Sequence, residues 1–337
     1  MARLLVIGGT GFLGYYTILD ALKKGFKEED IGTISYKDID LEGWFPKGIK
    51  VDYMDVFTCT EDELVPLMKG YDYMVYSVGP DDRYTPPKPS YKFFHDRLVI
   101  ACAKVFRAAE RAGIKKSVVY NSYFTYFNDI YPKLKLVKYH PYVRCRVEQA
   151  KLLNEQKKNM QVVVLELPYI FGSMPKRTPL WRGVFLDRYL NGHKVIFFPK
   201  GTTTMIHVKH IGEAGMGALL YGKDGAYYPI GDQNKSYNFM LDEMMKDLIG
   251  HTRKIVNPAG FLCAFGAWFI VANDKLHGHE PGLNYTKVMS QIMSKDIVIP
   301  EDVMDSVNAE LHITRGDLEE GIKDTIEACY PDKKEFK

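Results

Sequence analysis

The chain has 337 residues, of which 46% are hydrophobic and 26% are charged. This composition is ordinary for a soluble globular protein, and the length allows one large α/β domain or two smaller ones around a substantial core. The 45 basic and 42 acidic residues give a net charge of +3. That balance is too even to indicate nucleic acid or an anionic membrane surface as a partner.

The cysteines and the start of the chain bear on its location. The five cysteines lie far apart and form no CxxC pair, which argues against a zinc site or a disulfide framework and favours a reducing cytoplasm. The three residues Met1-Ala2-Arg3 lead directly into the first apolar run, so we expect no signal peptide. The most apolar stretch, residues 259–272, is shorter than the ~20 residues of a spanning helix. We therefore expect no membrane span, and we interpret this stretch as a buried helix or a wall of the substrate pocket.

The first element is a short apolar run, residues 4–7, followed at once by the turn GGTGFLG, residues 8–14. The run predicts a buried strand, and apolar residues at helical spacing from Phe12 onward predict a helix. A strand, a glycine turn and a helix N-terminus together form an anion site, because unpaired N–H groups and the helix dipole point at one place. The turn therefore predicts a dinucleotide site, the alternative being a turn that only connects two elements.

Further apolar runs alternate with segments of helical pattern, which predicts a parallel, doubly wound sheet. The predicted strands span residues 31–36, 49–54, 73–78, 117–122 and 161–167, and the predicted helices span residues 61–69 and 91–112. The loop 79–90 carries four prolines and should be stiff at the carboxyl edge of the sheet. It either walls a substrate pocket or only connects two elements at the surface.

The glycine spacing GxxGxxG resembles the short-chain dehydrogenase/reductase superfamily, in particular its extended or atypical, epimerase/dehydratase-like branch. The resemblance implies a Rossmann-type dinucleotide-binding domain over residues 1–172. It also implies a smaller α/β substrate-binding portion over residues 173–337, with some strands returning to the main sheet. Segments 181–190, 236–250 and 317–330 fit its helices, and segments 194–198 and 226–231 fit its strands.

The resemblance also implies which residues contact the cofactor: the glycine turn, the ends of three strands and the segment after the sixth strand. These residues are Gly8, Thr10, Gly11, Phe12, Leu13, Gly14, Tyr36, Lys37, Asp55, Val56, Ser77, Val78, Gly79, Pro168 and Ile170. The second strand ends at the adenosine ribose, where an acidic residue is usual for NAD and a basic one for NADP. Here Lys37 favours NADP(H) over NAD(H), whereas Asp38 argues the other way.

The predicted catalytic residues also follow from the resemblance. Ser122 ends the fifth strand, where the family keeps a hydroxyl that binds the reacting oxygen, and Tyr142 with Arg146 matches the family's YxxxK motif on a helix. That spacing puts both side chains on one helix face, where a cation favours the phenolate of a tyrosine. Arg146 replaces the family's Lys, so it supplies charge and ribose contacts but interrupts a proton relay. The alternative is a helix that only packs and binds ribose.

The resulting prediction is an NAD(P)-dependent oxidoreductase that moves a hydride between nicotinamide and a carbonyl or secondary alcohol of a fairly apolar small molecule. One alternative is a nucleotide-sugar epimerase or dehydratase with bound NAD, for which Arg177, Arg182 and Arg188 leave room. A second is a non-catalytic NADP(H)-binding sensor or scaffold. We expect no metal site, although His207 and His210 lie three apart. The resemblance implies a homodimer through helices 91–112 and 142–157.

Overall fold

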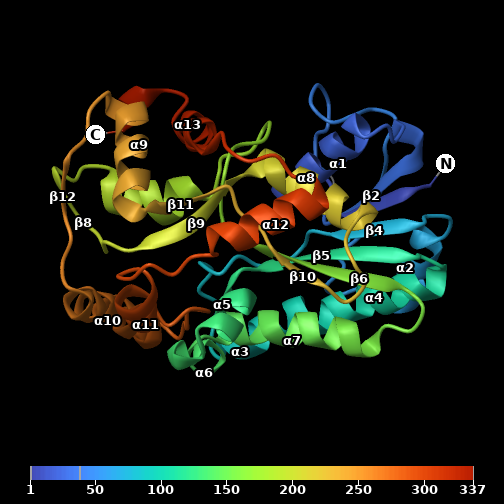
Figure 1. Ribbon diagram of the computed structural model, residues 1–337, viewed down its shortest axis with the longest axis horizontal. Coiled ribbons are helices and arrows are strands. Elements are labelled where there is room, and N and C mark those ends of the chain that lie inside the picture. Colours follow the sequence, from blue (N-terminus) through green and yellow to red (C-terminus); the bar gives the residue numbers. More distant parts are fainter. Residues whose placement is uncertain (1, 38, 337) are drawn as a thin grey trace.

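A seven-stranded parallel sheet lies at the centre of the protein, in the order β10-β6-β5-β4-β1-β2-β3 (Figure 1). The computed structural model describes residues 2–37 and 39–336, so Asp38 lies outside the described residues. The strands are β1 (Leu4–Ile7), β2 (Ile31–Ser35), β3 (Lys50–Tyr53), β4 (Tyr73–Tyr76), β5 (Lys116–Ser122), β6 (Gln161–Leu167) and β10 (Tyr227–Pro229). The order reverses between β1 and β4, which is where doubly wound sheets bind ligands. The predicted fold class is confirmed.

Helices cover both faces of this sheet, which is why the central strands β1 and β4 consist of apolar and aromatic residues (Figure 1). On one face lie α1 (Phe12–Lys23), α8 (Val208–Leu220) and α12 (Glu301–Leu311). On the other lie α2 (Glu61–Met68), α4 (Ala101–Ala112) and α7 (Pro141–Gln156). The predicted long helix 91–112 is α3 (Ser90–Phe94), a π-helical stretch (His95–Ile100) and α4, and it ends at Gly113 in a left-handed conformation.

The second half of the chain builds a separate core beside the sheet. Strands β7 (Tyr169–Phe171), β9 (Thr202–His207) and β11 (Gln233–Ser236) form one small sheet, and β8 (Val195–Phe197) pairs with β12 (Lys254–Val256). A π-helical stretch (Arg182–Leu190) and helices α9 (Tyr237–Ile249) and α13 (Leu318–Cys329) cover them. Strand β10, from the same half, pairs with β6 in the main sheet.

The remaining α-helices of the described residues are three short ones and one long one, and a π-helical stretch (Val288–Ile292) follows the last short one. The short ones are α5 (Phe124–Ile130), α6 (Leu136–Tyr139) and α11 (Tyr285–Lys287). The long one, α10 (Gly260–Leu276), lies at the periphery beside α11 (Figure 1). Of the two alternatives for this apolar stretch, the buried helix is wrong, and the pocket wall stays a prediction. Only Ala267 of α10 is buried, while Phe261 is 71% exposed, because a single edge of the helix packs against the protein.

Helix length sets a limit on membrane crossing. Among residues 2–37 and 39–336, no helix is both long enough and apolar enough to traverse a bilayer.

Candidate functional site

The glycine turn between β1 and α1 has the geometry of an anion cradle. Gly8 has a φ of +85°, a region that favours glycine, and its carbonyl accepts from the Gly11 N–H at 2.9 Å. A Cβ on Gly14 would lie 2.3 Å from the Gly8 carbonyl oxygen, so α1 approaches the turn this closely only with glycine there. Gly11 begins the helix without a capping side chain, which leaves the first N–H groups of α1 for a ligand. The turn therefore fits the pyrophosphate of a dinucleotide.

Arg177, from the second half of the chain, faces this cradle. Its guanidinium lies 3.9 Å from the position that a Cβ on Gly11 would take, and the residue is exposed. A cation at this place can pair with a phosphate group. Arg182 is engaged elsewhere, because it donates to the Cys329 carbonyl at 2.9 Å and pairs with Glu335.

The end of β2 carries hydroxyl and basic groups beside the turn. The buried Ser35 hydroxyl accepts from the Thr10 hydroxyl at 2.9 Å. Tyr36 is 67% exposed, and Lys37 after it is also exposed. Both side chains are thus free to meet a ribose or its phosphate.

The end of β4 lies against the same turn. The Ser77 hydroxyl donates to the Ile7 carbonyl at 2.8 Å, and a Cβ on Gly8 would lie 2.7 Å from Val78 Cγ2. A Cβ on Gly79 would lie 3.7 Å from the Arg146 guanidinium. The structure therefore brings these predicted cofactor residues next to the glycine turn on one side and Arg146 on the other.

The remaining predicted cofactor residues already make packing contacts or hydrogen bonds within the protein. Val56 is 5% exposed and packs in the core with Leu64 and Met68. The Asp55 carboxylate accepts from the Phe57 N–H at 2.9 Å. Pro168 is buried, and the Ile170 carbonyl accepts from the Trp181 indole N–H at 2.9 Å. Their cofactor roles stay predictions.

Tyr142 and Arg146 meet directly on α7. Pro141 starts this helix, and the four-residue spacing lets Arg146 Nε donate to the Tyr142 hydroxyl at 3.0 Å. The same guanidinium donates through Nη1 to the Tyr120 carbonyl at 3.1 Å and to Gln149 Oε1 at 3.0 Å. Arg146 is 8% and Tyr142 5% exposed, so burial and these hydrogen bonds restrict the positions of both side chains.

Ser122 lies at the carboxyl end of β5, where the sequence predicts it. Its Oγ accepts from the Phe124 N–H at 3.4 Å, which leaves its hydroxyl hydrogen for another acceptor. The residue is 7% exposed. Its role in binding a substrate oxygen stays a prediction.

The electrostatics of Tyr142 differ from what the motif alone suggests. Burial raises the pKa of its phenol, and the carboxylates of Asp82 and Asp81 raise it further. The charge and hydrogen bond of Arg146 lower that pKa, but the net shift is upward. Arg146 therefore acts on the phenol in the predicted direction without outweighing burial.

A half-buried acid pair in the proline-rich loop was missed by the sequence analysis. Arg83 binds Asp81 through two hydrogen bonds of 2.7 Å, and its Nε lies 3.8 Å from Asp82. Burial alone would raise the pKa of Asp81, but the charge and hydrogen bonds of Arg83 lower it to about 2. Burial and the neighbouring Asp81 raise the pKa of Asp82 to about 7. The only sequence signal was the run Asp-Asp-Arg itself, in a loop that we expected either to wall a pocket or to be a plain connection.

Aromatic side chains line the space around this acid pair. The Arg83 guanidinium lies 5.1 Å from the centre of the Trp181 ring, which stacks on Phe171 at 4.6 Å. Tyr169 lies 5.8 Å from Trp181, and the charge of Asp82 adds to burial in raising its pKa to about 12. Phe265 and Trp268 belong to the stretch 259–272 that we expected to be buried or to wall the pocket, and they lie on exposed α10.

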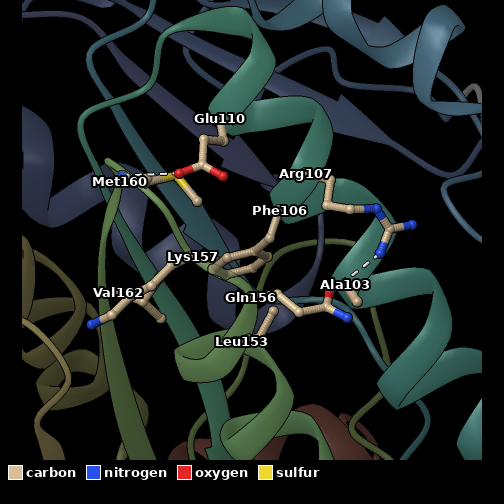
Figure 2. A pocket seen from close by; sticks show the side chains of 9 residues that line it. All are labelled: Ala103, Phe106, Arg107, Glu110, Leu153, Gln156, Lys157, Met160 and Val162. Carbon is tan, nitrogen blue, oxygen red and sulfur yellow. Dashed lines mark hydrogen bonds between the residues drawn. The ribbon is translucent and has the colours of Figure 1, made fainter.

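A small pocket between α4 and α7 lies away from this chemistry (Figure 2). It is lined by Ala103, Phe106, Arg107, Glu110, Leu153, Gln156, Lys157, Met160 and Val162. Its volume of 10 Å³ holds about one water molecule. The Glu110 carboxylate accepts from the Met160 N–H, and Arg107 donates to Gln156 Oε1 at 3.4 Å, so these polar groups serve the fold (Figure 2).

His207 and His210 are also used by the fold. His210 Nδ1 lies 2.7 Å from Asp232 Oδ1, and the His207 N–H donates to Oδ2 of the same carboxylate at 2.8 Å. In the described part of the chain, no three His, Cys, Asp or Glu side chains gather as a metal site. Burial raises the pKa of Glu166, at the end of β6, well above its usual range.

Comparison with known proteins shows what this arrangement resembles. No known family profile matches the chain. The structure superposes on the crystal structure of gox2253 with a TM-score of 0.76 and 17% identity, covering 100% of both chains. The chain therefore shares its fold with that structure. At the level of the fold, this agrees with the resemblance predicted from the glycine turn.

Two further likenesses concern proteins with known ligands or names. The UDP-glucuronic acid 4-epimerase from Bacillus cereus, solved with NAD, has a TM-score of 0.64 and 13% identity and covers 97% of this chain and 99% of its own. The Mus musculus sterol-4-alpha-carboxylate 3-dehydrogenase, decarboxylating, is 25% identical over 187 residues. That match covers 52% of this chain and 48% of the mouse protein, so the chain matches about half of its length.

Proposed function

We propose that this chain is an NAD(P)-dependent oxidoreductase that interconverts a carbonyl and a secondary alcohol. The observation that carries the proposal is the 3.0 Å contact of Arg146 with the Tyr142 hydroxyl. This contact lies beside Gly79. Gly79 follows strand β4, and the residues after β4 lie against the glycine turn. A phenol held at that place can exchange a proton with a substrate oxygen while the bound nicotinamide exchanges a hydride with the carbon.

The side chains of the chain divide the remaining work. The Ser122 hydroxyl donates to the substrate oxygen and orients it. Arg146 holds the Tyr142 phenol in place and stabilises negative charge as it develops on it. Arg146 stays protonated, so a group other than Arg146 must return the proton that the Tyr142 phenol gives to the substrate. Asp82, with a pKa of about 7, is suited to hold and release a proton at neutral pH.

Replacement of Tyr142 tests the catalytic proposal. We expect Tyr142→Phe to lower kcat about 100-fold or more, because the phenol proton is lost, while NADPH affinity stays within about twofold. Tyr139→Phe, on the neighbouring short helix α6, is the matched control and should keep full turnover. Equal activity of Tyr142→Phe and the wild type would refute the assignment. NADPH binding without turnover on any carbonyl would instead favour a non-catalytic sensor.

We further infer that the preferred cofactor is NADP(H). The supporting observations are the Ser35 hydroxyl at the end of β2, the exposed Lys37 after it and the Arg177 guanidinium at the glycine turn. Fluorescence titration with NADPH and NADH checks this for the wild type and Lys37→Ala. Tighter binding of NADPH that the variant loses is the expected result. Tighter binding of NADH would contradict the preference.

The second candidate is a nucleotide-sugar epimerase that keeps bound NAD. It is favoured by the exposed guanidinium of Arg177 at the glycine turn, because guanidinium groups bind diphosphates. The substrate of the first candidate would instead be fairly apolar, as the ring of Trp181 and its neighbour Tyr169 indicate. Cofactor content separates the two, since the epimerase retains NAD through purification and the reductase does not.

A further inference from the structure

A tight turn from the second half of the chain approaches the glycine turn. Shortly after β7, residues 174 and 177 pair as an antiparallel bridge and enclose Pro175 and Lys176; these four residues are here called the 174–177 turn. Lys176 has a φ of +55°, a left-handed conformation that favours glycine or asparagine. A lysine held in that conformation points to a role for its side chain.

The start of the 174–177 turn is fixed to the protein. The Ser173 carbonyl accepts from the Tyr16 hydroxyl of α1 at 2.8 Å. Met174 is 8% exposed and belongs to the apolar core that also contains Tyr15 and Phe45. The turn is therefore anchored beside α1, the helix that begins at the glycine turn, and its exposed residues 175–177 extend from this anchor.

The two cations of the turn reach different parts of the first half of the chain. The Arg177 guanidinium faces the glycine turn, 3.9 Å from the position of a Cβ on Gly11. Lys176 Nζ instead donates to the Asp40 carboxylate and, at 3.0 Å, to the Glu42 carbonyl. Asp40 and Glu42 lie in the loop after β2, the strand whose end is predicted to meet the adenosine ribose.

The loop that receives Lys176 is also held in place. The Trp44 indole N–H donates to the Asp40 carbonyl at 2.9 Å, and the Trp44 carbonyl accepts from the Tyr15 hydroxyl at 3.4 Å. The hydrogen bonds from Lys176 and from the Glu42 N–H lower the pKa of Asp40, so its carboxylate is ionised at neutral pH. The ion pair of Lys176 with Asp40 therefore joins two anchored segments.

We propose that the 174–177 turn is a clasp over the pyrophosphate of the bound dinucleotide, and that Lys176 is a positioning residue that keeps the clasp closed through its ion pair with Asp40. This inference rests on the proposed binding of NAD(P) at the glycine turn. A pyrophosphate bound to the N–H groups of that turn meets the guanidinium of Arg177 from the other side.

Release of the dinucleotide then requires the clasp to open. The ion pair that must break is exposed, with side-chain exposures of 50% for Lys176 and 68% for Asp40. An exposed pair of this kind is weak, so the clasp can open each time the cofactor exchanges, and the pair affects the rate of release more than the stability of the protein.

Displacement kinetics with the full chain test the proposal. Protein loaded with NADPH is mixed with excess NADP+, and the loss of bound NADPH fluorescence gives the dissociation rate constant; NADH with excess NAD+ is run in parallel. We expect Lys176→Ala to raise this rate constant about threefold to fivefold, the range that a weak surface pair allows. Its melting temperature without cofactor should equal that of the wild type.

The matched control breaks another exposed ion pair. Lys115 pairs with Asp72 just before β5 and β4, at the amino ends of the strands, whereas dinucleotides bind at the carboxyl ends. Lys115→Ala should therefore release NADPH at the wild-type rate.

Charge reversal separates the ion pair from other effects of Lys176. Lys176→Asp and Asp40→Lys should each speed release, whereas the double variant Lys176→Asp/Asp40→Lys should restore slow release. A residue that only shapes the turn would give no such rescue. These rates need no turnover, so they are read independently of the proposed oxidoreductase activity.

Proteolysis gives a second measurement, because the turn carries two exposed trypsin sites, Lys176 and Arg177. Saturating NADPH should slow cleavage at these sites about fivefold or more. Lys333 and Lys334, exposed beside α9, provide the reference sites in the same digest and should be cleaved at nearly the same rate with and without NADPH.

Four outcomes would overturn the clasp. In the first, Lys176→Ala releases NADPH and NADH as slowly as the wild type. In the second, the double reversal releases the cofactor as fast as the single reversals. In the third, NADPH leaves cleavage at residues 176 and 177 unchanged. A wild type that turns over a carbonyl but shows any of these results lacks only the clasp, whereas one that binds neither dinucleotide, the fourth outcome, lacks the proposed function as well.

Discussion

Asp81 and Asp82 show how one loop can give neighbouring carboxyl groups opposite properties. The two hydrogen bonds from Arg83 hold Asp81 ionised, whereas Asp82 shares the same burial without comparable hydrogen bonds. A second negative charge beside Asp81 is therefore costly, and Asp82 takes up a proton near neutral pH. Groups in this state are suited to proton exchange in a cleft.

The effect of Asp82 on stability has a definite sign. Its pKa rises from 3.8 in the unfolded chain to about 7 in the folded one, so the folded state binds more protons in that window. Stability should fall as pH rises from about 4 to 7, by at most ~1.4 kcal/mol per pH unit from this group. Asp82→Asn should remove that dependence and be more stable than the wild type at pH 8. Urea unfolding at pH 5 and pH 8 measures the difference.

Asp81→Asn is the control with the opposite sign. The folded pKa of Asp81 is lowered to about 2, so its contribution is present above the unfolded value and lost as pH falls. This variant should therefore be less stable than the wild type at pH 8. If the wild type and Asp82→Asn showed the same change of stability between pH 4 and 7, the raised pKa of Asp82 would be contradicted. In the activity profile, Asp82→Asn should also lose an ionisation near pH 7.

At the scale of elements, the junction of β1 and α1 depends on the absence of a side chain at Gly14. A Cβ there would meet the Gly8 carbonyl oxygen at 2.3 Å and Gly9 Cα at 2.8 Å, both backbone atoms that cannot turn aside. Gly14→Ala should therefore cost about 1–3 kcal/mol of stability and weaken dinucleotide binding, because the turn must open. Gly266→Ala, on open α10, should instead be neutral or stabilise by up to about 1 kcal/mol.

Chemical unfolding and cofactor titration of these two variants give the measurement. Both replace a helical glycine by alanine, so intrinsic helix propensity acts in the same direction in each. A Gly14→Ala protein as stable as Gly266→Ala would show that the close approach of α1 to the turn does not matter.

The elements of the sheet could be predicted because each depends on local pattern. Apolar runs buried on both faces and a glycine turn at β1 are local signals, and they locate the strands to within a residue or two. The contact of Tyr142 with Arg146 also follows from spacing within one helix. What could not be predicted are features set by distant segments: the partial burial of Asp82, the approach of Arg177 to Gly11 and the exposure of α10.

At the scale of the whole molecule, the cofactor cradle joins the two halves of the chain. The glycine turn comes from the first half, while Arg177 comes from the segment after β7 in the second half. A dinucleotide bound on the turn would be contacted by both. Binding to the folded state alone stabilises a protein by RT ln(1 + [L]/Kd), about 2.7 kcal/mol at a ligand concentration of 100 Kd.

We therefore expect NADPH to raise the melting temperature of the wild type by several degrees and to do so less at the same concentration for Arg177→Ala. The smaller rise in melting temperature would reflect a weaker affinity for NADPH, because the second half of the chain no longer supplies a guanidinium to a phosphate. Arg111→Ala is the control, because Arg111 pairs with Asp62 on the outside of α2 and lies on an exposed face. An equal rise in all three proteins would mean that Arg177 leaves the cofactor untouched and that the first half of the chain binds it alone.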